Sequence, residues 1–108
     1  MIREIKGDDY KKEVIGNQGP VLLLAYAPWC GDSQRILPVF ETISCLPEHS
    51  QVCFLRMDVD KNPRSKEDLQ VERYPTLFLF KDGRKAAEQV AEVSGEEQKA
   101  IIKSLLCK

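Results

Sequence analysis

A cysteine and a serine stand three residues apart in the stretch Cys30-Gly31-Asp32-Ser33, which closely follows the most apolar run of the chain, residues 21–27. A helical pattern comes next, so we expect a strand to end and a helix to begin here. Unpaired backbone N–H groups and the dipole at a helix N-terminus favour a thiolate over a thiol. Cys30 is therefore the candidate nucleophile.

The residues after Cys30 decide how such a nucleophile would be supported. Positions three apart are neighbours on a helical turn, so we expect the Ser33 hydroxyl to donate a hydrogen bond to the Cys30 sulfur. A serine can steady a thiolate in this way, but it cannot form a disulfide. The carboxylate of Asp32 suits the helix dipole and also repels a nearby thiolate, which leaves the sign of its net effect open.

At these residues the sequence resembles the thioredoxin family, whose motif reads Trp-Cys-Gly-Pro-Cys. Trp29, Cys30 and Gly31 match the motif, Asp32 stands where the family has proline, and Ser33 stands where it has the second cysteine. The resemblance implies a thiol–disulfide oxidoreductase. Because Ser33 cannot resolve a disulfide, we expect Cys30 to attack a disulfide and then to wait, as a mixed disulfide, for an external thiol.

The resemblance also implies a groove for an extended substrate segment. Pro75 matches the cis-proline of the family, and Tyr74 before it would offer its backbone N–H and C=O to the substrate strand. Trp29 would line this groove beside the nucleophile, together with Gly31 and Asp32 of the motif. The turn Val90-Ala91-Glu92 would frame its other side.

Two further departures from the family lie on the predicted strands. Family members often bury a carboxylate where this chain has Leu24, and a lysine usually accompanies it where this chain has Arg56. The family's carboxylate assists deprotonation of the second cysteine, so its loss is consistent with Ser33. The alternative is that Ser33 replaces a native cysteine by engineering, in which case the native function is ordinary dithiol reduction.

The elements that must position these residues form an alternating β and α pattern. Residues 21–26 are apolar without alternation, which is typical of a strand covered on both faces. Ile36, Phe40 and Ile43 recur at helical spacing after Ser33, with Pro38 inside the helix at a position where we expect a kink. The other predicted elements are a strand at 2–5, a helix at 8–15 capped by Asp8, a strand at 52–59, a helix from Asn62-Pro63, a hairpin around Asp82-Gly83 and a helix after Ser94.

This order is that of the thioredoxin fold. We therefore expect an α/β fold in which a central mixed sheet of four to five strands is flanked by helices on both faces. A chain of 108 residues suits one domain, residues 1–108, with a single core.

Composition restricts the partners. The net charge is -1 and no basic tract is present, which argues against nucleic acid or an anionic membrane. The longest apolar run is too short for a membrane span, and the first dozen residues mix charges where a signal peptide is apolar. We therefore expect a cytoplasmic protein. The resemblance implies that it acts as a monomer on thiol or disulfide client proteins, with a thioredoxin reductase or a low-molecular-weight thiol as reductant.

The remaining cysteines give no second motif. Cys53 lies in an apolar segment and is interpreted as structural. Cys45 and Cys107 lie near helix ends, and the resolution of Cys30 by one of them in another molecule stays an alternative. His49 has no metal-ligand spacing to any cysteine, so we expect no metal and no cofactor.

Two other functions stay open. The first is a non-catalytic binding module, whose groove captures extended segments without using the Cys30 thiol. The second follows from the likeness of Cys-Gly-x-Ser to the monothiol glutaredoxin motif, some members of which bridge an iron–sulfur cluster with glutathione.

Overall fold

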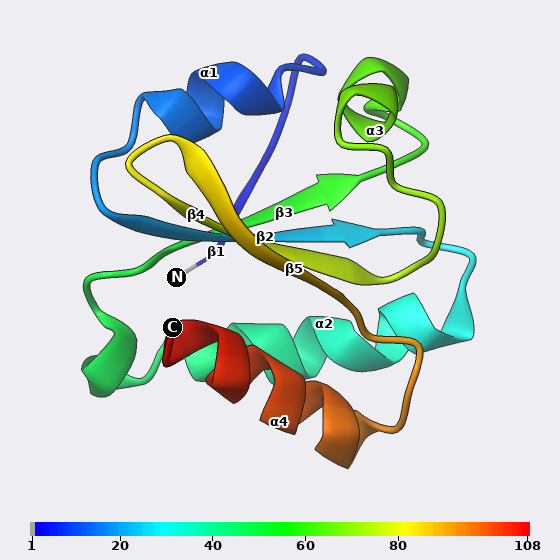
Figure 1. Ribbon diagram of the computed structural model, residues 1–108. Coiled ribbons are helices and arrows are strands. Elements are labelled where there is room, and N and C mark those ends of the chain that lie inside the picture. Colours follow the sequence, from blue (N-terminus) through cyan, green and yellow to red (C-terminus); the bar gives the residue numbers. More distant parts are fainter. Residues whose placement is uncertain (1) are drawn as a thin grey trace.

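A five-stranded mixed sheet runs through the molecule, with helices on both of its faces (Figure 1). The computed structural model describes residues 2–108. The strand order is β1-β3-β2-β4-β5; β1, β3 and β2 are parallel, whereas β4 and β5 are antiparallel to their neighbours. The predicted fold class is confirmed. The strands are β1 (Ile2–Glu4), β2 (Pro20–Tyr26), β3 (Cys53–Asp58), β4 (Thr76–Lys81) and β5 (Arg84–Val90).

Four α-helices and one short 3-10 helix complete the described chain. Helices α1 and α3 cover one face of the sheet, and α2 and α4 cover the other (Figure 1). No helix within residues 2–108 is long and apolar enough to cross a membrane. The helices are α1 (Tyr10–Ile15), α2 (Gly31–Ser44), the 3-10 turn Pro47–His49, α3 (Pro63–Asp68) and α4 (Gly95–Leu106).

Strand β2 is the centre of the core because it pairs with β3 on one side and β4 on the other. Its side chains alternate between two apolar clusters. Val21, Leu23 and Ala25 join the cluster that includes side chains of α1, whereas Leu22 and Leu24 join the one built on α2 and α4. Both faces of β2 are therefore buried, which is why its sequence is apolar throughout.

Helix α2 carries the nucleophile at its start and is held by its apolar face. Ile36, Phe40 and Ile43 are almost fully buried, and the Phe40 ring meets Phe54 of β3 edge to face at 5.4 Å. Pro38 lies inside a helix that is continuous from Gly31 to Ser44. The packing of this one face fixes the direction in which the helix presents its N-terminus.

The loop before α1 caps two helices. The prediction that Asp8 caps α1 is wrong: the carboxylate of Asp9 accepts the Lys12 N–H instead. Asp8 has a left-handed backbone (φ +55°), and its carboxylate accepts the N–H groups of Arg64 and Ser65 in α3. Desolvation alone would raise the pKa of Asp8, but these hydrogen bonds outweigh it and hold the pKa below its ordinary value.

Candidate functional site

Cys30 lies at the junction between the end of β2 and the start of α2, as the sequence predicts. The turn from Ala27 to Cys30 is closed by a hydrogen bond from the Cys30 N–H to the Ala27 C=O at 3.0 Å. Cys30 is the N-cap residue of α2, with an extended backbone (φ -93°, ψ 127°), and its own C=O accepts the Gln34 N–H. The side chain is half-buried, and its Sγ lies 3.7 Å from the Tyr74 C=O.

The segment opposite the sulfur carries the predicted proline. The Tyr74–Pro75 peptide bond is cis, which confirms the prediction for Pro75. The Pro75 C=O accepts the Ala91 N–H at 2.8 Å, whereas the Tyr74 N–H has no hydrogen-bond partner within residues 2–108. A backbone donor and an acceptor are thus presented beside Cys30, as strand addition by an extended peptide requires.

Trp29 and Tyr74 form an aromatic pair beside Cys30. The Trp29 side chain is 66% exposed, and its ring meets Tyr74 edge to face at 5.6 Å between centroids. Its Nε1 donates to Asp60 Oδ2 at 2.9 Å, which fixes the indole. On the other side the Lys66 Nζ lies 5.4 Å from the centre of the Tyr74 ring, and hydrogen bonding with that side chain raises the pKa of Lys66.

Ser33 does not support the sulfur in the predicted way. Its hydroxyl is fully buried and accepts the Ala27 N–H at 3.1 Å, and no hydrogen bond to Cys30 is found in the described chain. The expected Ser33–Cys30 bond is wrong because Cys30 has the extended backbone of a cap residue, so its side chain turns toward Tyr74. Ser33 instead anchors the turn that leads to the nucleophile.

The charge of Asp32 is compensated locally. Its Oδ1 lies 2.5 Å from Arg35 Nη1, which also donates to the Val93 C=O at 3.0 Å. The predicted repulsion between Asp32 and a thiolate is therefore opposed by a cation on the same helical turn. A Cβ placed on Gly31 would meet no atom within 4 Å, so the space in front of this turn is open.

Gln98 of α4 joins the two sides of the site, and sequence reasoning missed it. The side chain is fully buried, and its Nε2 donates to the C=O groups of Asp32 (2.9 Å) and Ala91 (3.0 Å). Its Oε1 has no partner in the described chain. The sequence does hold a signal for Gln98. This polar residue stands at helical spacing from the apolar Ile102 and Leu105, which places it on the buried face of the helix.

The turn after β5 lies where the sequence places it. Val90 pairs with Thr76 at the start of β4, and Ala91 is fully buried. Since Ala91 bonds through its N–H to Pro75 and through its C=O to Gln98, the three predicted segments of the site meet in one place.

The two departures on the strands lie behind the site. Leu24 is fully buried in the cluster of α2, so this position brings no carboxylate to the reactive turn. Arg56, its partner in the sheet register, places its Nε 2.5 Å from Glu4 Oε1 on β1.

The other three thiols lie far from Cys30. Cys45 is the C-cap of α2, roughly 22 Å along the helix from the N-cap. Cys53 pairs with Val21 at the opposite end of β2, and burial raises the pKa of its thiol. Cys107 follows the last turn of α4. Within residues 2–108 all four thiols are free, and no cluster of three metal-ligating side chains is found.

Comparison with known proteins decides the family. The model of the thioredoxin family matches residues 1–107. This chain belongs to the thioredoxin family. It is 34% identical over 99 residues to thioredoxin from Mycolicibacterium smegmatis, which covers 91% of this chain and 85% of that one. Thioredoxin from Porphyra purpurea is 33% identical over 107 residues and covers 99% of this chain and 95% of its own.

A solved thioredoxin shares the fold. The crystal structure of thioredoxin from Malassezia sympodialis matches with a TM-score of 0.80 and 31% identity, covering 97% of this chain and 91% of that chain. These matches favour the thioredoxin over the glutaredoxin interpretation. The protein is thus a thiol–disulfide oxidoreductase of thioredoxin type, a class that acts on thiol or disulfide client proteins.

Proposed function

We propose that this thioredoxin-family protein works with one thiol: Cys30 attacks a client disulfide, and an external thiol completes the reduction. One observation carries the proposal. The Cys30 sulfur faces the Tyr74 C=O at the groove, whereas the position three residues on is a buried hydroxyl already bonded to Ala27. The place of a second thiol is therefore taken by a group that anchors the turn.

The reaction balances in three exchanges. The Cys30 thiolate attacks one sulfur of the client disulfide, and the other client sulfur leaves as a thiolate that takes up a proton. An external thiolate then attacks the Cys30 sulfur and expels the second client thiolate. A second external thiolate regenerates Cys30, so that one client disulfide is reduced while two external thiols become one disulfide.

The positions of the other three cysteines support the use of an external thiol. The helix length alone separates Cys45 from Cys30 by roughly 22 Å, whereas a disulfide needs Cα atoms within about 7 Å. Cys53 and Cys107 also lie at the end of their elements that is remote from the reactive turn. Within residues 2–108, each of the other thiols thus lies at the far end of an element from Cys30, which supports a thiol from outside the molecule.

The groove supplies the client contacts. An extended client segment would pair with the N–H and C=O of Tyr74, and the exposed Trp29 would cover an apolar side chain beside it. The reductant is a low-molecular-weight thiol, because a thioredoxin reductase acts on an intramolecular disulfide, which Cys30 and Ser33 cannot form. The setting is the cytoplasm, with the protein acting as a monomer.

The test compares the protein with its Ser33→Cys variant in the reduction of a protein disulfide. Each protein is supplied either with a small monothiol or with a thioredoxin reductase. We expect turnover with the reductase only in the variant, because a reductase reduces an intramolecular disulfide, and monothiol-driven turnover in both proteins. Equal reductase-driven turnover by both would overturn the proposal.

A second candidate function is capture of extended segments without chemistry. The exposed indole of Trp29 favours it, and so does the Tyr74 N–H, which has no partner among the described residues; neither needs a reactive sulfur. Alkylation separates the two functions: under native conditions near neutral pH, Cys30 modified about tenfold faster than the exposed Cys45 and Cys107 supports chemistry. Equal rates at the three thiols would favour binding alone.

A further inference from the structure

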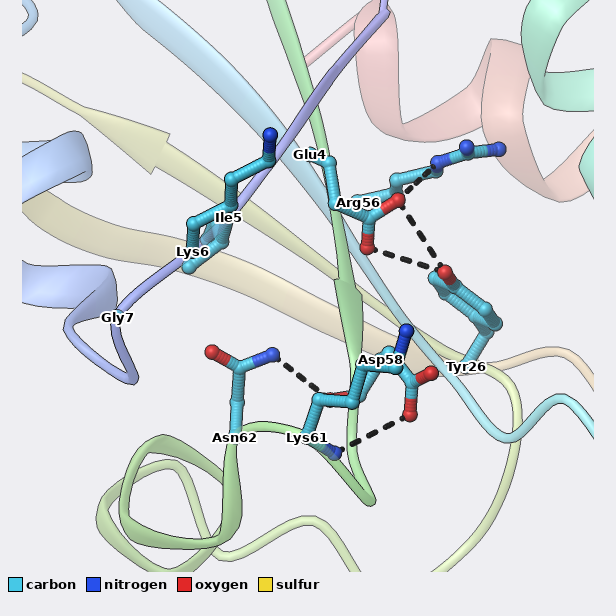
Figure 2. Close-up of a pocket in the computed structure, with 9 residues that line it drawn as sticks. All are labelled: Glu4, Ile5, Lys6, Gly7, Tyr26, Arg56, Asp58, Lys61 and Asn62. Carbon is cyan, nitrogen blue, oxygen red and sulfur yellow. Dashed lines mark hydrogen bonds and ion pairs between the residues drawn. The ribbon is translucent and has the colours of Figure 1, made fainter.

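We propose that the pocket at the carboxyl ends of β1, β3 and β2 binds a small peptide-like thiol that carries two carboxylates and one ammonium group. The proposal rests on the one-thiol function above, because it names the external thiol that function requires. The pocket measures about 490 Å³, within the range of small-molecule sites. Its lining is drawn in Figure 2 and consists of Glu4, Ile5, Lys6, Gly7, Tyr26, Arg56, Asp58, Lys61 and Asn62.

The floor of this pocket is held by hydrogen bonds. The Tyr26 hydroxyl donates to both carboxylate oxygens of Glu4, at 3.0 and 3.3 Å, and Arg56 Nε pairs with the same carboxylate (Figure 2). Asp58 Oδ1 accepts the backbone N–H groups of Asp60 and Lys61. The floor is therefore formed before any ligand arrives.

Three charged groups of the lining make no ion pair within residues 2–108 and have capacity left for a ligand. The Asp58 side chain belongs to a residue only 6% exposed, and its Oδ2 has no partner in the described chain. The ammonium groups of Lys6 and Lys61 likewise have no hydrogen bond or ion pair within residues 2–108. The Glu4 carboxylate, in contrast, is taken up by Tyr26 and Arg56.

These free groups define the charge pattern of the ligand. Two ammonium groups at the rim suit two carboxylates, and one free carboxylate oxygen at the floor suits an ammonium group. The whole lining carries three cations (Lys6, Arg56, Lys61) and two carboxylates (Glu4, Asp58), which favours a ligand of net negative charge. A tripeptide-sized molecule with two carboxylates and one ammonium group matches the volume of the pocket, its free charged groups and the net charge of its lining.

The pocket lies within reach of the nucleophile. Tyr26 ends β2, and the next four residues form the turn closed by the Cys30 N–H and the Ala27 C=O. Because of this turn, the Cα atoms of Tyr26 and Cys30 lie within about 11 Å of each other. A tripeptide-sized ligand has about this length when it is extended. Lys61 also follows Asp60, which holds the indole of Trp29.

The bound thiol would perform the second exchange of the cycle. Its thiolate attacks the Cys30 sulfur of the mixed disulfide, the Cys30–client bond breaks, and the client sulfur leaves as a thiolate that is protonated. A second molecule of the same thiol then releases Cys30, and the pair departs as a disulfide.

Binding is tested first without chemistry. S-methylglutathione has the proposed charges but no free thiol, and its titration is followed by NMR of the ¹⁵N-labelled protein. We expect the amide signals of Gly7, Lys61 and Asn62 to shift, and the affinity to fall about tenfold in Lys6→Gln/Lys61→Gln. The matched control is Lys11→Gln/Lys103→Gln, which removes the same charge outside the pocket and should bind as the parent does. Shifts absent from the pocket, or weakened equally in both variants, would overturn the proposal.

Release is tested with a preformed mixed disulfide at Cys30. For each protein the rate with glutathione is divided by the rate with 2-mercaptoethanol, which has no charge. We expect this ratio to fall about tenfold in the pocket variant and to hold in the control variant. An equal ratio in all three proteins would overturn the proposal. Binding of S-methylglutathione to a protein whose Cys30 never forms a mixed disulfide would instead refute the one-thiol function and leave the pocket standing.

Discussion

At the scale of single residues, the backbone at the helix cap decides what Cys30 and Ser33 can do. The sequence predicts that Cys30 lies at the start of a helix, since an apolar run ends there and helical spacing follows. It does not predict the direction of the side chains, because that depends on the extended conformation of the cap. The sulfur consequently turns to Tyr74, and the Ser33 hydroxyl turns inward to Ala27.

This inward bond makes Ser33 a stabilising residue. In Ser33→Ala the buried Ala27 N–H loses its acceptor, and we expect the free energy of unfolding to fall by about 1–3 kcal/mol. Urea unfolding of both proteins, with the thiols kept reduced, measures the difference. An alanine variant as stable as the parent would show that the hydroxyl does not hold the turn.

Tyr26 predicts a dependence of stability on alkaline pH. Burial and the neighbouring Glu4 carboxylate raise the pKa of Tyr26 to about 12 from an ordinary 10. Because the folded protein holds this proton more tightly, the stability it provides is complete below pH 10 and is lost as the pH rises to about 12. We expect Tyr26→Phe to be less stable by about 1.5–3 kcal/mol at pH 8, as for loss of a hydrogen bond to a charged group. The gap should narrow at pH 11.

The measurement is urea unfolding of the parent and Tyr26→Phe at both pH values. Comparing the two proteins at each pH removes the contribution of the other tyrosines and of the lysines. A gap that stays constant between pH 8 and pH 11 would contradict the bond between Tyr26 and Glu4.

At the scale of elements, the order of strands and helices follows from local pattern, but the contacts that join them do not. The hairpin around Asp82-Gly83 could be predicted because Asp-Gly favours the left-handed backbone that this turn requires. Both residues adopt that backbone in the structure. The cap that Asp8 gives to α3 could not, because Asp8 and Ser65 are 57 positions apart in the chain. The bond from Gln98 to Asp32 spans 66 positions.

Gln98 is expected to control how α2 and the Ala91 turn are held together. In Gln98→Glu a carboxylate replaces the amide that donates to the C=O groups of Asp32 and Ala91. At pH 7 we expect a loss of about 2–4 kcal/mol in the free energy of unfolding, because a buried acceptor charge then faces two carbonyls. The loss should shrink as the pH falls and the carboxylate takes up a proton.

Gln98→Leu is the matched control for this change. It removes the amide without adding a charge, so its stability relative to the parent should not vary with pH. Urea unfolding of the three proteins from pH 7 down to pH 5 provides the comparison. A loss in Gln98→Glu that is the same at every pH would contradict the placement of Gln98 between the two carbonyls.

At the scale of the whole molecule, the reactive groups gather at one end of the sheet. The carboxyl ends of the parallel strands, where open α/β sheets commonly bind ligands, lie at or beside three features of the site. These are Cys30, the Tyr74–Pro75 segment and the charged pocket. Cys45, Cys53 and Cys107 lie at the ends of α2, β3 and α4 that are remote from Cys30. The sequence gives these cysteines no partner, and the fold supplies the reason: each is the length of an element away from Cys30.

This separation predicts that three of the four thiols are dispensable. A variant in which Cys45, Cys53 and Cys107 are all alanine should reduce a protein disulfide, with a small monothiol as reductant, within about twofold of the parent rate. Cys30→Ser, in contrast, should abolish turnover. A large loss in the triple variant, once circular dichroism shows that it is folded, would mean that one of the remote thiols takes part.

The most direct measurement of the one-thiol mechanism is the intact mass of the protein after it meets a client disulfide without any other thiol. The parent should accumulate as a covalent adduct with one half of the client, attached at Cys30, whereas Ser33→Cys should release the reduced client and keep an internal disulfide. A parent protein that returns the reduced client in the absence of an external thiol would contradict the mechanism.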